Sequence, residues 1–123
     1  MNDVSRYEGN PAPGGAVFDP AEASRALGLT LEEFTPLLAK AAREIRFRLD
    51  AVRQGVAEED LRAVALNSHT LKSVVATLRA EAVRDAAIAM ERCAKEGECT
   101  RCAGMLTCLE ERAAELLAEL DDV

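Results

Sequence analysis

Four long segments of the sequence repeat apolar residues at intervals of three and four, the spacing that places side chains on one face of an α-helix. We expect these helices over residues 30 to 55, 58 to 78, 81 to 96 and 101 to 120, with Gly55 and Gly97 ending two of them. Because the connections between them are short, successive helices should run antiparallel. The sequence therefore predicts an all-α fold, an antiparallel up-down-up-down four-helix bundle.

A shorter helix is expected before the bundle. Asp19 and Pro20, followed by Glu22, form a helix-start signature, and Gly28 marks the end, so we predict a short N-terminal lid helix across one end of the bundle. Residues 1 to 17 are interrupted by Gly and Pro and offer little to bury, so we expect a flexible N-terminal tail. The helical bundle domain should then span residues 18 to 123.

The charge balance limits the classes of partner. The formal net charge is −7 and the pI is about 4.8, which argues against a nucleic-acid or anionic membrane surface because such surfaces are held mainly by clustered Lys and Arg. No segment has the apolar length of a signal peptide core or a membrane span. We therefore expect a cytoplasmic protein with a protein or small-molecule partner.

The only histidine of the chain, His69, falls on the predicted helix over residues 58 to 78. On a helical wheel it lies roughly 100° or more from the middle of the expected core face, which comprises Leu61, Val64, Ser68, Leu71, Val75 and Leu78. An outward-facing histidine needs no function in itself. Here, however, its neighbours on the outward face are small or apolar, and they could form a partner-docking surface: Ala65, Leu66, Ser73 and Ala76.

The chemistry that fits this setting is nucleophilic transfer by imidazole, since the neutral ring is abundant near neutral pH and one nitrogen can attack while the other keeps its proton. The ammonium of Lys72, on the adjacent helical row, could stabilise an anionic group carried on the ring. Enzymatic alternatives lack parts: there is no second histidine for a metal-carboxylate bundle and no Gly-rich phosphate loop.

The run SHTLKSVVATLRAEAVRDAAIAMERCAKEG, residues 68 to 97, resembles the histidine-containing phosphotransfer (HPt) domain of multistep phosphorelays. The positions that carry the resemblance are His69, Leu71, Lys72, Ser73, the pair Met90-Glu91, and Gly97. The resemblance implies a carrier that is not an enzyme and has no cofactor of its own, with His69 as phospho-acceptor and Lys72 supporting the phosphoryl group. It also implies that the partners are receiver domains of hybrid sensor kinases and response regulators, which supply the aspartate and the Mg²⁺.

The chain departs from the family pattern at two positions. Ser73 replaces the usual glycine near the histidine and is still small enough for a receiver loop to approach. Arg79 stands where the family often has a second glycine, in the passage to the next helix. If that position requires a positive φ, Arg79 costs on the order of 1–2 kcal/mol there.

Four cysteines, Cys93, Cys99, Cys102 and Cys108, surround the last predicted turn and leave two alternatives open. They could bind Zn²⁺ or form a redox disulfide such as Cys99–Cys102, although only the central Cys-x-x-Cys has a usual half-site spacing. Packing explains them more simply, with Cys93 and Cys108 as small buried residues on regular helix. A pure interaction module that docks on a kinase or receiver without carrying phosphate is the remaining alternative.

Overall fold

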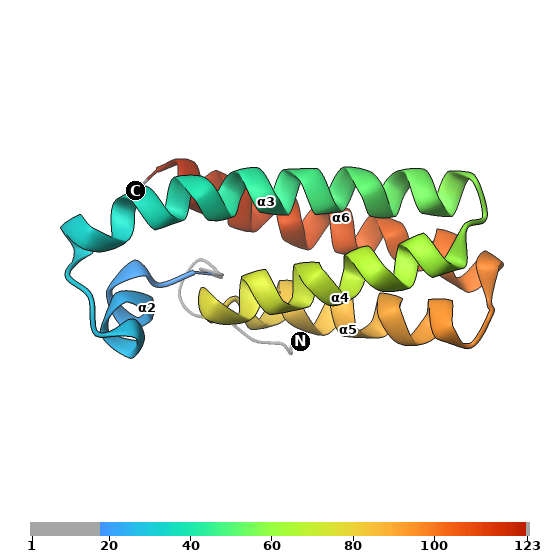
Figure 1. Ribbon diagram of the computed structural model, residues 1–123, viewed down its shortest axis with the longest axis horizontal. Coiled ribbons are helices and arrows are strands. Elements are labelled where there is room, and N and C mark those ends of the chain that lie inside the picture. Colours follow the sequence, from blue (N-terminus) through green and yellow to red (C-terminus); the bar gives the residue numbers. More distant parts are fainter. Residues whose placement is uncertain (1–17, 123) are drawn as a thin grey trace, which may run out of the picture.

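The computed structural model describes residues 18–122, and all regular secondary structure within that range is helical (Figure 1). The elements are α2 (Pro20–Leu27), α3 (Leu31–Ala57), α4 (Leu61–Thr77), α5 (Glu81–Lys95) and α6 (Cys99–Asp121). The all-α prediction is therefore confirmed. The predicted tail, residues 1 to 17, lies outside the described residues.

The four long helices lie side by side along the length of the molecule (Figure 1). α3 contacts α4 and α6, and α5 contacts α4 and α6, so the four helices enclose one core. The largest fully buried side chains come from all four: Phe34, Ile45, Leu71, Met90, Leu109 and Leu116. Removal of these apolar side chains from water, at about 1.5–3 kcal/mol each, is the main force that holds the helices together. α2 packs against α3, at the end of the molecule where α3 begins.

The first two helices begin where their capping residues place them. The Asp19 carboxylate accepts hydrogen bonds from the backbone N–H groups of Ala21 and Glu22. Thr30 and Glu33 form a reciprocal capping box at the start of α3. These side chains satisfy N–H groups that have no partner within the helix, so the sequence signature is a physical start signal.

Gly55 does not end α3, which corrects the predicted helix boundary. The helix continues to Ala57, and Gly55 is buried against α4, where an added Cβ would lie 2.9 Å from Cγ2 of Val64. The turn is made instead by Glu59, with φ 56°. α4 then begins at Leu61 rather than near residue 58, because the Asp60 side chain accepts from the N–H of Ala63 and caps the helix there. Gly55 thus allows close contact between α3 and α4 and takes no part in the chain reversal.

The turns at the two ends of α5 both use a left-handed residue. Arg79 has φ 58° and lies in the passage from α4 to α5, as its position in the family pattern suggests. Gly97 has φ 76° in the passage from α5 to α6. α6 begins at Cys99, two residues before the predicted start. The N–H of Cys102 reaches the carbonyl oxygen of Glu98 at 3.0 Å, so the first helical turn forms directly after the connection. No helix within residues 18–122 has the length and apolar character to cross a membrane.

Candidate functional site

α4 divides into a buried face and an open face, and His69 belongs to the open one. Val64, Ser68, Leu71 and Val75 are fully buried, and Leu78 is nearly so, as the helical wheel predicts. Leu61 is only half-buried, because it stands at the first position of the helix. The side chain of His69 is 55% exposed.

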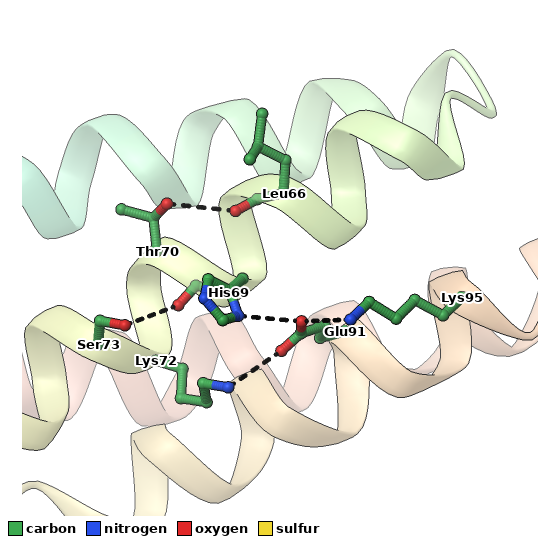
Figure 2. A network of polar contacts seen from close by, with 7 residues as sticks. All are labelled: Leu66, His69, Thr70, Lys72, Ser73, Glu91 and Lys95. Atoms are coloured by element: carbon green, nitrogen blue, oxygen red, sulfur yellow. Dashed lines mark hydrogen bonds and ion pairs between the residues drawn. The ribbon is translucent and has the colours of Figure 1, made fainter.

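The imidazole of His69 meets a buried carboxylate that comes from the neighbouring helix. Glu91 lies on α5 with only 10% of its side chain exposed, and its Oε2 is 3.1 Å from Nδ1 of His69. The same carboxylate contacts Nζ of Lys72 at 3.4 Å and Nζ of Lys95 at 2.9 Å. Figure 2 shows the carboxylate between these three nitrogen-bearing side chains, two from α4 and one from α5.

Two opposing effects, burial and hydrogen bonding, set the charge state of Glu91. Burial opposes ionisation of the carboxyl group, but hydrogen bonds from Lys95, His69 and Lys72 outweigh it and lower its pKa. At neutral pH the group is therefore a carboxylate, which can only accept hydrogen bonds. It follows that Nδ1 of His69 is the donor, and that Nε2 of the neutral ring carries the free lone pair.

The surface around the ring is open. Leu66 is 62% exposed, and Ser73 and Ala76 are exposed, whereas Ala65 is half-buried. The hydroxyls of Ser73 and Thr70 fold back onto helix carbonyls, donating to the backbone oxygens of His69 and Leu66, each at 3.3 Å (Figure 2). Ser73 therefore does not hold the ring. The four residues predicted to form a docking surface all lie on α4, but Ala65 is less accessible than the wheel suggests because α4 packs between α3 and α5.

From the sequence, Glu91 stands out only as half of the Met90-Glu91 pair, with no sign that it belongs to the site. A signal was present, because Ala87, Met90 and Ala94 are core positions of α5 and Glu91 is a carboxylate on that buried face. A charged residue at such a position requires partners. The sequence could not say which partners, since His69 and Lys72 reach Glu91 from another helix. Lys95, one turn after Glu91, was also missed.

The cysteines are separate from this site. Cys93 and Cys102 are buried, Cys99 is half-buried and all four thiols are free. Cys108 is exposed, which contradicts the prediction that it packs as a small buried residue; the neighbouring Leu109 takes the core position instead. Burial, together with a hydrogen bond to Cys93, raises the pKa of Cys102 to about 11. Within residues 18–122, no group of three or more His, Cys, Asp or Glu side chains is arranged to hold a metal ion.

Comparison with known proteins gives one result. The model of the Hpt domain family matches residues 25–123, which is most of the chain. No curated protein and no solved structure gives a match. The matched range includes all four long helices and His69. The chain belongs to the Hpt domain family, whose domains carry phosphoryl groups in two-component signalling.

Proposed function

We propose that this protein is a histidine phosphotransfer protein of a multistep phosphorelay, which accepts a phosphoryl group from a receiver-domain aspartate on His69 and passes it to another receiver. The observation that carries the proposal is the pairing of an exposed imidazole with an ionised, buried carboxylate. The contact between Nδ1 and Glu91 selects the tautomer in which Nε2 can attack.

The transfer needs no proton to move at the ring. The Nε2 lone pair attacks phosphorus of the aspartyl phosphate, the P–O bond breaks, and the aspartate carboxylate leaves with the electron pair. The cationic ring that results keeps its proton on Nδ1, which donates a hydrogen bond to the Glu91 carboxylate. Because Lys72 is 3.4 Å from Glu91 and lies one helical turn from His69, its ammonium can turn to the phosphoryl oxygens as charge develops there. The Mg²⁺ is expected on the receiver, so this chain acts as a carrier without a cofactor of its own rather than as an enzyme.

The receiver should approach over the open face of α4, with Ala65, Leu66, Ser73 and Ala76 in the docking surface. Exposure of Leu66 and the small size of the other three support this assignment. We also infer that α3 to α6 form an antiparallel up-down-up-down bundle with α2 as a lid, since the connections between the long helices are only three residues long. A cytoplasmic location stays a prediction of the sequence.

The decisive experiment compares His69→Gln with a matched control, Thr107→Gln, an exposed position on α6. Both proteins are incubated with a labelled, phosphorylated receiver and assayed for acid-labile, base-stable label. His69→Gln should accept none and keep its helical circular dichroism, because an outward-facing side chain contributes little to the core. Thr107→Gln should be labelled at the wild-type rate. Receiver binding without transfer in the wild-type protein would instead identify a pure interaction module.

A further inference from the structure

The buried carboxylate beside His69 has a consequence for the phosphorylated state. Once Nε2 carries the phosphoryl group, Nδ1 can donate to Glu91 only if the ring is a protonated phosphoimidazolium. An ionised carboxylate at 3.1 Å favours that form, since a charge-assisted hydrogen bond is roughly twice as strong as a neutral one. A ring without this partner would lose its proton more readily.

We propose that Glu91 keeps Nδ1 of phosphorylated His69 protonated, so that the phosphoryl group leaves readily. The positive charge of Lys95 weakens this effect of Glu91. The inference rests on the proposed role of His69 as phospho-acceptor. In this assignment Glu91 and Lys95 are positioning residues that act through the imidazole. Together they set how long the phosphoryl group stays on the carrier.

The bond changes explain why the proton matters. When the N–P bond of the phosphoimidazolium breaks, the electron pair stays on Nε2, the proton stays on Nδ1 and the leaving group is neutral imidazole. A ring without the Nδ1 proton would have to leave as an imidazolate anion, which is a much poorer leaving group. The phosphoryl group passes to a receiver carboxylate, or to water, in which case inorganic phosphate forms and the proton of the water goes to solvent.

Lys95 is placed to weaken the effect of Glu91. Its Nζ is 2.9 Å from Oε2, the same oxygen that faces Nδ1 of His69, whereas Lys72 contacts Oε1. The two lysines flank a shallow hollow between α4 and α5 that also includes Glu91. When Lys72 turns to the phosphoryl group, Lys95 is the cation that remains on the carboxylate. Its positive charge opposes the pull of Glu91 on the proton.

The charged groups of α3, the other helix beside α4, form contacts with one another. On α3, Arg48 pairs with Glu44 at 2.7 Å and donates to the side-chain oxygen of Asn67 at 2.9 Å. These groups satisfy one another and make no contact with His69. On α5, Arg92 and Glu96 also line the hollow, and Glu96 pairs with Arg101. Within residues 18–122, the charged groups bonded to the imidazole or to its carboxylate partner are Glu91, Lys72 and Lys95.

The two substitutions Glu91→Gln and Lys95→Gln should have opposite effects, which makes the test sharp. Each protein is phosphorylated with phosphoramidate, freed of donor, and followed by ³¹P NMR at a pH of about 8.5, where an ordinary imidazole is neutral. Glu91→Gln should lengthen the lifetime of phosphohistidine by about five- to tenfold. Lys95→Gln, an exposed change that leaves folding intact, should shorten it by about two- to threefold. Arg84→Gln, an equal charge change on α5 at a residue that forms no ion pair within residues 18–122, should match the wild type.

A spectroscopic signature separates this assignment from a purely structural role. In phosphorylated wild-type protein, the ¹⁵N shift of His69 Nδ1 should be that of a protonated nitrogen, and in Glu91→Gln it should move towards the unprotonated value. Unchanged lifetimes, or changes of the same sign in both variants, would overturn the inference while leaving phosphate acceptance by His69 intact. Failure of wild-type His69 to accept phosphate from either phosphoramidate or a receiver would reject the proposed function itself, and this inference with it.

Discussion

Two regions of the protein bring nucleophilic side chains to α5, and they treat them in opposite ways. At the contact with α4, the nucleophile is exposed and its partner is buried: the ring of His69 faces solvent while Glu91 lies beneath it. At the turn into α6, the nucleophile is itself buried, because Cys102 is fully covered and lies against Cys93. A buried partner leaves the nucleophile accessible while it fixes its orientation. A nucleophile that is itself buried is out of reach of a reactant.

The charges around each group reinforce the difference. Three nitrogen donors surround Glu91 and hold it ionised despite burial. Around Cys102, burial and the neighbouring thiols of Cys93 and Cys99 all oppose ionisation, and Arg101 offsets them only weakly. The carboxylate of Glu91 is therefore ionised at neutral pH, whereas the thiol of Cys102 stays protonated. This difference supports the proposed phosphoryl chemistry at the first region and a packing role for the second.

The largest expected effect concerns the surface that a receiver must reach. Ala76→Trp adds bulk to the exposed face of α4, and Ala103→Trp makes the same change at an exposed position of α6. Transfer from a phosphorylated receiver should fall about a hundredfold in Ala76→Trp, since a misplacement of about 1 Å is enough to cost that much. Ala103→Trp should transfer normally. Labelling by phosphoramidate should be affected far less in both, and equal receiver-dependent rates would place the docking surface elsewhere.

A smaller effect is expected from Lys72→Ala. In the proposed function the ammonium stabilises charge on the phosphoryl oxygens and forms no bond to phosphorus, so transfer should slow by about tenfold and still proceed. Stopped-flow or quenched-flow rates at low salt measure the change. Arg62→Ala, a cation on the exposed side of α4, provides the control. Rates for Lys72→Ala that equal those of the control would remove Lys72 from the site.

The cysteine region predicts a change in stability and none in transfer. Because the pKa of Cys102 is raised in the folded protein from 9.0 to about 11, its contribution is fully present below pH 9 and is lost as the pH rises through 11. The free energy of unfolding of the wild type, measured with denaturant, should therefore fall over this range by about 3 kcal/mol from this group. Cys102→Ala should remove that part of the decline, and Cys108→Ala should retain it. An alkaline profile unchanged in Cys102→Ala would mean that the thiol is not buried in solution.

Much of this arrangement could be predicted from local sequence. Apolar spacing identified the buried face of α4, and side-chain caps at Asp19 and Thr30 fixed where α2 and α3 begin. The prediction that Gly55 ends α3 was wrong because a glycine can either end a helix or allow another helix to approach. Only the packing of Val64 against Gly55 distinguishes the two. The role of Glu91 was missed for a related reason. Its partners come from two helices, and pairing between helices has no local signature.

We propose that Nε2 of His69 receives the phosphoryl group while Nδ1 stays hydrogen-bonded to Glu91. The most direct measurement is ¹⁵N and ³¹P NMR of histidine-labelled protein after incubation with a phosphorylated receiver. We expect a phosphoryl group on Nε2 and a proton on Nδ1. Phosphate on Nδ1, or label that persists in His69→Gln, would contradict it.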